Sequence, residues 1–409
     1  MDARSCRLPL LASQIGLRDA HLHDPTGAGN TLMQVQRITG PLEVSLLITA
    51  ITRVHTEFDT LRVSFDVSGN WTQVVHPPSD PVEVIDLRDS TDATARADAL
   101  CHDLAGRRVD VTDGSTLFRA LIIRLTNEQT WLALVGHHLI VDGYTVKLGF
   151  ERVAEIYDCL IDERPVPESN ALPLAAFVRS LQPPLPDLDF WRDYLRDAED
   201  VLCGRPVAPC APSGPHRVST VLPGARLAWE KQGQRWPIGA IAACCSFFGA
   251  DSGRGEAIVG LMLSGRRTEA ELRTPCQLMT TLPLRVRTAG VTRDELFADV
   301  LAGIHLLLER RHDRPEQLLL NIPAGWRCGR LYGPSLNVVP YDAQPAYRGC
   351  RTEFDTLARG PVDDVTVTIA AHGEQDILLE VLANPLIHTP EEAANIHSGL
   401  AGNLVNWMG

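Results

Sequence analysis

The sequence lacks the patterns that mark several large classes of protein. None of its ten cysteines forms a C-x-x-C pair, and no Cys/His group has zinc-finger spacing. No apolar run is long enough to cross a membrane, and the N-terminus has an acid at Asp2 and only a short apolar stretch, unlike a signal peptide. The nucleophile-elbow pattern G-x-S-x-G is also absent. We therefore expect a soluble cytoplasmic protein with free, buried thiols, not a disulfide scaffold or a serine hydrolase of that type.

Basic side chains are scarce relative to acidic ones. The chain has 38 Lys and Arg against 51 Asp and Glu, which gives a formal net charge of -13. Such a surface repels nucleic acid and anionic membranes, so we expect neither as a partner.

The length and the order of apolar patterns indicate two α/β domains. A chain of 409 residues exceeds one ordinary hydrophobic core. Both halves alternate helix-like and strand-like segments, and a proline-rich stretch over residues 163–217 separates them. We place the domains at residues 1–175 and 176–409.

The stretch VGHHLIVDGYT, from Val135 to Thr145, concentrates polar groups where an apolar strand ends. Side chains alternate along a strand, so His137 and His138 are expected to point to opposite faces. Histidine changes charge near neutral pH, which suits proton transfer. Asp142 follows four residues after His138, and Gly143 permits a tight backbone turn before a helix. Strand, loop and helix with polar groups at the junction is a usual place for catalytic residues.

Taken alone, these residues allow several interpretations. Both histidines can be packed residues without chemistry. A metal site is conceivable because His138 and Asp142 are four residues apart, but the run before them is strand-like and no third ligand has suggestive spacing. A Cys/His pair stays open as well, although the cysteines lie in apolar settings typical of inert thiols.

The pattern H-H-x-x-x-D-G resembles the signature of the condensation domains of nonribosomal peptide synthetases, in the chloramphenicol-acetyltransferase-like superfamily. Further similarities follow in order along almost the whole chain. They are LLASQIGL around Ser13, VHTEFDTLRVSF with Leu61, Arg62 and Phe65, FWRDYL, LSGRRTEAELRTPCQLMTTLPLRV, RRHDRPEQLL, and PSLNVVPY with Asn337.

The sequence also departs from the family pattern. Cys276 and Thr280 stand where the family usually has glycine and asparagine, and Tyr144–Thr145 replaces an aromatic–serine pair. The aromatic residues that usually follow the opening motif are missing, and the stretch from Pro223 to Ser264 is short. These departures concern the substrates more than the fold.

The resemblance implies an α/β fold of two acetyltransferase-like subdomains arranged as a V, with the active site in the channel between them. His138 would lie near the middle of the channel, its ring open to solvent from both sides. A donor acyl group would arrive as a thioester on the phosphopantetheine of a carrier protein, and an amine or hydroxyl acceptor would attack it to form an amide or ester. No bound cofactor and no metal are implied.

The resemblance also assigns roles to individual residues. His138 would accept a proton or hydrogen-bond the acceptor and the tetrahedral intermediate. Asp142 would pair with Arg62 and hold the loop in shape. Gly143 would let the backbone approach the reacting carbon and offer an N–H to the oxyanion, and His137 would pack. Three further residues are assigned to the substrate channel: Tyr144, Thr280 and Asn337.

The sequence contains no adenylation segment and no carrier serine motif. We therefore expect a free-standing, monomeric condensation enzyme that meets carrier proteins and a small-molecule acceptor in trans. The alternatives are a non-catalytic module that recruits partners to a carrier-bound peptide, an epimerase-type relative, and an acyltransferase that uses coenzyme A.

Overall fold

The computed structural model describes residues 6–23, 29–181, 186–202, 208–209, 211, 214–314, 318–319, 329–342 and 345–409. The chain forms two compact units. Unit 1 comprises Met1–Gln182, Arg266–Leu278 and Ala343–Pro361, and unit 2 comprises Pro183–Gly265, Met279–Asp342 and Val362–Gly409.

Unit 1 is built on a five-stranded sheet in the order β12-β2-β7-β6-β5 and a small sheet in the order β1-β4-β3. Its elements are β1 (Cys6–Pro9), α1 (Ala12–His23), β2 (Thr31–Thr39), α2 (Val44–Glu57), the 3-10 helix η1 (Asp59–Arg62), β3 (Val63–Asp66), β4 (Thr72–Val75), β5 (Val82–Asp86), α3 (Ala93–Gly106), β6 (Phe118–Arg124), β7 (Gln129–His137), α4 (Gly143–Ile161), α5 (Leu174–Ser180), α10 (Glu269–Arg273) and β12 (Arg351–Arg359).

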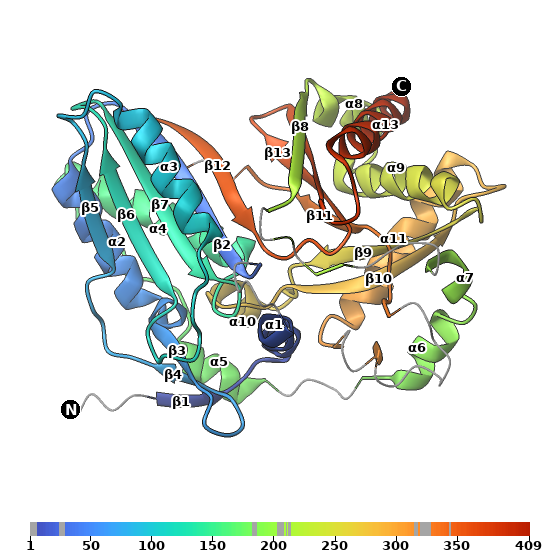
Figure 1. Cartoon of the computed structure of the whole chain (residues 1–409), viewed down its shortest axis with the longest axis horizontal. Coiled ribbons are helices and arrows are strands. Elements are labelled where there is room, and N and C mark those ends of the chain that lie inside the picture. The colour runs from blue at the N-terminus through green and yellow to red at the C-terminus, as the bar shows by residue number, and fades with distance from the viewer. Residues whose placement is uncertain are drawn as a thin grey trace. The chain divides into compact units, whose positions relative to one another are not determined.

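Helices cover both faces of the five-stranded sheet of unit 1 (Figure 1). α2 and α4 pack on one face and α3 on the other, which produces two separate apolar clusters. The central strand β7 is therefore buried on both sides, and this explains why its sequence is a nearly continuous apolar run. The edge strand β12 comes from the second half of the chain and pairs antiparallel with β2.

Unit 2 is built on a six-stranded sheet in the order β10-β9-β11-β13-β14-β8. Its elements are α6 (Leu188–Tyr194), α7 (Glu199–Leu202), β8 (His216–Leu222), α8 (Ala225–Lys231), α9 (Trp236–Asp251), β9 (Glu256–Leu263), β10 (Thr280–Arg287), α11 (Arg293–Glu309), β11 (Ser335–Val339), β13 (Val365–His372), β14 (Asp376–Ala383) and α13 (Pro390–Met408). A single apolar cluster joins this sheet to α9, α11 and α13.

The two units share a four-stranded plan. In unit 1 the order β2-β7-β6-β5 has two antiparallel pairs followed by one parallel pair. In unit 2 the order β8-β14-β13-β11 repeats those directions. In each unit the last of these strands in the chain leads into a 19-residue helix, α4 or α13. The prediction of two similar α/β subdomains is confirmed, and their V-shaped arrangement stays a prediction.

The division of the chain differs from the two continuous ranges expected from the sequence. The first boundary, Gln182/Pro183, lies within the proline-rich stretch and seven residues beyond the predicted one. Two later segments then return to unit 1, namely Arg266–Leu278 and Ala343–Pro361. They return because each makes main-chain or side-chain contacts with the first half, through Arg266 and through strand β12.

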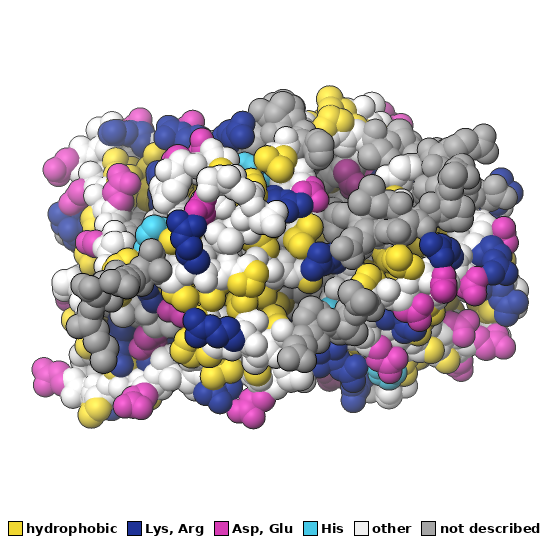
Figure 2. All heavy atoms as spheres, turned by 90° about the horizontal axis from the view of Figure 1, so that it is seen from below, with side chains coloured by type: hydrophobic (Ala, Val, Ile, Leu, Met, Phe, Trp, Pro, Cys, Tyr) yellow, Lys and Arg dark blue, Asp and Glu magenta, His cyan; other side chains and the backbone are white. Residues whose placement is uncertain are grey.

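Charged side chains of both signs are interspersed on the face drawn in Figure 2, with hydrophobic side chains between them. The described part of that face shows no continuous basic surface. No helix in the described part of the chain has the length and apolar character needed to span a membrane.

Candidate active site

The junction between β7 and α4 presents the two histidines. β7 ends at His137, the loop 138–142 follows, and α4 begins at Gly143. The Asp142 side chain caps the helix, since its Oδ1 accepts a hydrogen bond from the Thr145 N–H at 2.8 Å. A carboxylate at this position satisfies an N–H that has no partner within the helix. The cap fixes where the loop ends.

His137 is fully buried and contacts α1. Its Nε2 lies 3.2 Å from Nδ1 of His21, and its Nδ1 accepts a hydrogen bond from the Leu139 N–H at 3.0 Å. Burial holds the pKa of the His137 ring well below its usual value, and the nearby rings of His21 and His138 lower it further. The ring is thus neutral and enclosed, as a packing residue would be.

His138 is also buried, with 3% of its surface exposed. Its Nε2 lies 3.2 Å from the carbonyl oxygen of Arg359, at the end of β12. A Cβ at Gly360 would lie only 3.0 Å from Cδ2 and Nε2 of the ring. The expectation of a ring open to solvent from both sides is therefore wrong, because the Arg359–Gly360 turn covers it.

The electrostatics of His138 keep the ring neutral. Burial lowers the pKa of the His138 ring, while the hydrogen bond to Arg359 and the charge of Asp142 oppose this shift only in part. Because a carbonyl can only accept, the contact with Arg359 requires that Nε2 carries the hydrogen.

Asp142 pairs with Arg266. Nη1 of Arg266 lies 2.7 Å from Oδ2, and the N–H of Leu278 donates to the same oxygen at 3.0 Å. Both side chains are buried, with exposures of 0% for Arg266 and 1% for Asp142. Burial alone would raise the pKa of the Asp142 carboxyl, but the charge and hydrogen bonds of Arg266 hold it below its usual value. The result is an ionised, fully hydrogen-bonded brace for the loop.

The predicted pairing of Asp142 with Arg62 is wrong. The Arg62 guanidinium donates instead to four acceptors close to it in sequence or just after strand β4: the carbonyls of His55, Thr56 and His76 and the carboxylate of Asp59. These four contacts hold the guanidinium at the end of α2. Arg62 therefore braces the α2–β4 region and not the histidine loop.

The segment Arg266–Leu278 supplies the arginine that pairs with Asp142, a role that the resemblance assigned to Arg62. The Cys276 carbonyl accepts from Nη2 of Arg266 at 2.6 Å and from Oγ1 of Thr145 at 2.7 Å. The Cys276 thiol is buried, and burial raises its pKa. The signal for Arg266 was present in the matched G-R pattern of LSGRR, but nothing in the sequence linked it to Asp142.

The remaining predicted site residues lie in different places. Gly143 is exposed as the first residue of α4, and the Tyr144 ring lies under the Arg266 guanidinium at 4.6 Å. Unit 1 thus brings Tyr144 next to the brace of the histidine loop. Thr280 and Asn337 lie in unit 2, half-buried on β10 and β11. The assignment of these three residues to a substrate channel stays a prediction.

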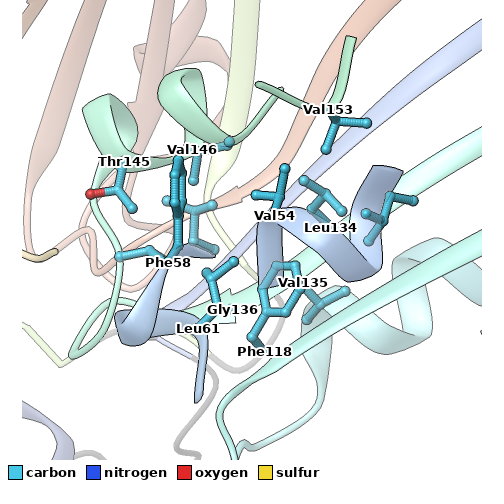
Figure 3. Close-up of a pocket in the computed structure, with 14 residues that line it drawn as sticks. Val54, Phe58, Leu61, Phe118, Leu134, Val135, Gly136, Thr145, Val146 and Val153 are labelled. Atoms are coloured by element: carbon cyan, nitrogen blue, oxygen red, sulfur yellow. The ribbon is translucent and has the colours of Figure 1, made fainter. Parts of the chain in front are cut away.

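An apolar pocket lies within unit 1 beside the same loop (Figure 3). Its volume is about 30 Å³, and its walls come from α2, η1, β2, β6, β7, the histidine loop and α4. Thr145 is its one polar lining residue, and in Figure 3 the Thr145 oxygen points away from the labelled apolar side chains. Within the described residues, no group of three or more His, Cys, Asp or Glu side chains could hold a metal ion.

Comparison with known proteins identifies the family and the fold of the chain. The family model described as "Condensation domain" matches residues 6–207. The chain belongs to the condensation-domain family of nonribosomal peptide synthetases. The matched range includes His137, His138 and the capping Asp142.

Two curated relatives illustrate the similarity of this condensation domain to larger proteins. It is 25% identical to a dimodular nonribosomal peptide synthase of Bacillus subtilis, over 96% of this chain and 17% of that protein. It is 28% identical to an isonitrile lipopeptide synthase of Streptomyces coeruleorubidus, over 96% of this chain and 28% of that protein. The chain thus spans less than a third of the length of these relatives.

Solved structures show the same fold. The first condensation domain of the calcium-dependent antibiotic synthetase, in complex with a substrate analogue, matches with a TM-score of 0.84 and 22% identity, over 99% of this chain and 97% of that one. A variant of the starter condensation domain of rhizomide synthetase, in complex with C8-CoA, matches with a TM-score of 0.84 and 23% identity, over 98% and 95%.

Proposed function

We propose that this condensation domain is catalytically active and joins a carrier-bound acyl thioester to an amine or hydroxyl acceptor. Condensation domains in general are acyltransferases that work with carrier proteins and acceptors. The observation that carries the proposal is His138, a neutral ring on a loop locked by the buried Asp142–Arg266 pair. A locked loop holds the ring in one orientation, which is what positional catalysis requires.

The proposed reaction needs little covalent chemistry from the protein. The acceptor nitrogen or oxygen attacks the thioester carbonyl carbon, and a tetrahedral intermediate forms. The C–S bond then breaks, and the phosphopantetheine sulfur leaves as a thiol after taking up the proton that the acceptor lost. The neutral ring of His138 can take part in two ways. With the hydrogen on Nε2, as in the Arg359 contact, the ring donates a hydrogen bond to the attacking group; to receive the proton at Nε2, the ring must carry its hydrogen on Nδ1 instead.

The Arg359 carbonyl has a defined place in this proposal. It occupies the Nε2 edge of His138 at 3.2 Å, which is a long hydrogen bond. An acceptor amine or hydroxyl would replace that carbonyl as the partner of Nε2. The Arg359–Gly360 turn must therefore shift before the acceptor reaches the ring.

Gly143 has a separate role in the proposal. It is exposed at the first position of α4, where backbone N–H groups and the helix dipole favour negative charge. Its N–H would donate to the oxyanion of the tetrahedral intermediate.

A coenzyme A thioester is the second candidate donor. The rhizomide synthetase neighbour was solved with C8-CoA, so the same fold accepts a donor outside a carrier protein. Both donors present the same phosphopantetheine thioester, and no bound cofactor enters either version. A direct comparison of acyl-carrier and acyl-coenzyme A donors separates them.

The test is a condensation assay with separately produced carrier proteins. The protein is incubated with acyl-loaded carrier and a panel of amines and alcohols, and products are read by mass spectrometry. His138→Ala should lower product formation by roughly 10²–10⁴-fold while the fold stays intact, because a positioned acid-base group contributes that much. His137→Ala should mainly lower thermal stability, since that ring is fully buried against His21.

A much smaller loss in His138→Ala would mean that positioning of the two substrates dominates, which a reactive amine permits. An unchanged rate with the native pair of substrates would remove the catalytic role. The non-catalytic recruitment module would then be the better interpretation.

A further inference from the structure

The middle of the histidine loop is held by side chains that lie outside it. At the near end the His138 N–H donates to the Asn30 carbonyl at 2.9 Å, and at the far end Asp142 caps α4. Leu139 and Ile140 lie between these ends and are fully buried, so each of their carbonyls needs a hydrogen-bond donor from the protein. The donors that reach these two carbonyls therefore fix the orientation of the backbone next to His138.

Gln14 on α1 supplies the first donor. Its Nε2 donates to the Leu139 carbonyl at 2.7 Å, and its Oε1 accepts a hydrogen bond from the Leu11 N–H at 2.6 Å. The other hydrogen of Nε2 is donated to Oε1 of Gln73 on β4 at 2.9 Å. The Gln14 side chain is buried, and these three bonds allow its amide only one orientation, with the nitrogen towards the histidine loop.

Thr60 in η1 supplies the second donor. Its Oγ1 donates to the Ile140 carbonyl at 2.6 Å, and the side chain is buried. Gln14 and Thr60 belong to two segments that resemble family motifs, LLASQIGL and VHTEFDTLRVSF, and neither residue has a part in the proposed reaction. Both donors are neutral, so they satisfy the buried carbonyls without placing a further charge beside the loop.

We infer that Gln14 and Thr60 are positioning residues for His138, because they hold the two carbonyls that follow it and so keep its ring in the orientation that the reaction needs. This inference rests on the proposed catalytic role of His138. The Asp142–Arg266 pair fixes the far end of the loop and leaves these carbonyls to the two side chains. A misplacement of about 1 Å can cost roughly 100-fold in rate.

Steady-state kinetics of the condensation gives the first test, with variants that remove a donor and keep the size of the side chain. Gln14→Met should lower kcat by about 10–100-fold and leave KM within about twofold, because the buried Gln14 acts through the loop. Thr60→Val should lower kcat as well but by less, since Ile140 is one residue farther from His138.

Gln73→Met is the matched control. Gln73 is as buried as Gln14 and belongs to the same pair of amides, but its Nε2 donates to the Pro9 carbonyl and not to the histidine loop. Gln73→Met and Gln14→Met should both lower the melting temperature by a few degrees, because each leaves buried polar groups unpaired. Only Gln14→Met should lower kcat. If Gln73→Met lowers kcat as much, the amide pair supports the fold alone and the inference is wrong.

Nuclear magnetic resonance of the His138 ring tests the positioning without turnover. The histidine rings are isotope-labelled, and the His138 signals are assigned by their loss in His138→Ala. Gln14→Met and Thr60→Val should shift or broaden these signals, and Gln73→Met should leave them in place. Should Gln14→Met not fold, Thr60→Val carries both measurements.

The two measurements together separate this inference from the proposed function. If the wild type condenses no substrate but the His138 signals change as expected, the positioning stands and the proposed catalysis fails. If the wild type is active, and Gln14→Met and Thr60→Val match it in kcat and in the ring signals, the inference is overturned while the proposed function stands.

Discussion

Replacing Arg266 with methionine should destabilise unit 1 strongly, because it leaves the Asp142 carboxylate buried without its cation. The two side chains are 0% and 1% exposed and 2.7 Å apart. Removing one partner of a buried ion pair typically costs about 3–5 kcal/mol. For a unit of this size, ~1 kcal/mol corresponds to roughly 2–4 °C in melting temperature. Arg266→Met should thus lower the transition of unit 1 by about 6–20 °C, and condensation activity should fall with it.

A double-mutant cycle isolates the pair. Asp142→Asn and Arg266→Met should each be destabilising, and the double variant should lose less than their sum, with a coupling energy of about 1–3 kcal/mol. The matched cycle of Asp142→Asn with Arg62→Met should be additive within about 0.5 kcal/mol, because Arg62 has other acceptors. Urea unfolding followed by circular dichroism measures both cycles. Equal coupling in the two cycles would refute the assignment of Arg266 as the partner of Asp142.

Two further changes test the surroundings of the histidine loop. Gly360→Ala should reduce condensation at least tenfold and shift the pH profile of kcat, since the new Cβ would lie 3.0 Å from the His138 ring and Gly360 has a φ of 102°; unchanged kinetics would mean that the turn does not lie over the ring during turnover. Burial, with the charge of Arg62, lowers the pKa of His55 to about 4. Between about pH 6.5 and about pH 4 the unfolded chain therefore carries a proton on His55 and the folded chain does not. The free energy of unfolding should therefore fall as pH drops through that window, and urea titrations at pH 7 and pH 5 should show a weaker loss in His55→Gln; an identical loss would place the pH dependence in other groups.

The sequence predicted the regular elements well where their signal is local. Steps of three and four along residues 44–58 indicated a buried helical face, and α2 spans Val44–Glu57. The apolar stripe after Gly143 likewise indicated the helix that became α4. These elements follow from side-chain periodicity within one turn or one pleat, so a single sequence carries the information.

The contacts that position the candidate site residues join parts of the chain that are far apart in sequence, and they were not predicted from the sequence. Arg266 is 124 residues from Asp142, and Arg359 is 221 residues from His138. Two of the matched motifs each contain an arginine, and only the three-dimensional packing shows that Arg62 bonds to local carbonyls and to Asp59 while Arg266 reaches Asp142. The burial of His138 depends in turn on β12, an edge strand that the second half of the chain adds to the sheet of unit 1. No periodicity within either half encodes that insertion.

Both units share the same strand plan, so their strand-to-helix corners, β7–α4 and β14–α13, can be compared to find which features of the histidine loop the fold itself requires. In unit 2 the strand β14 leads into α13 through a corner like that between β7 and α4, and the Thr389 side chain caps the helix as Asp142 does. At that corner Asn384 satisfies its amide on backbone carbonyls, including that of Val362 at 3.0 Å. The corner therefore folds with a cap and an amide, without paired histidines. That corner also holds one histidine beside a buried ion pair, since Nε2 of His388 lies 2.8 Å from Oδ1 of Asp364 and Asp364 pairs with Arg330 at 3.0 Å. The corners differ in what caps the helix: in unit 1 the carboxylate that pairs with an arginine is itself the cap of α4, whereas Thr389 caps α13. The link between ion pair, helix cap and histidine loop in unit 1 favours a chemical role there.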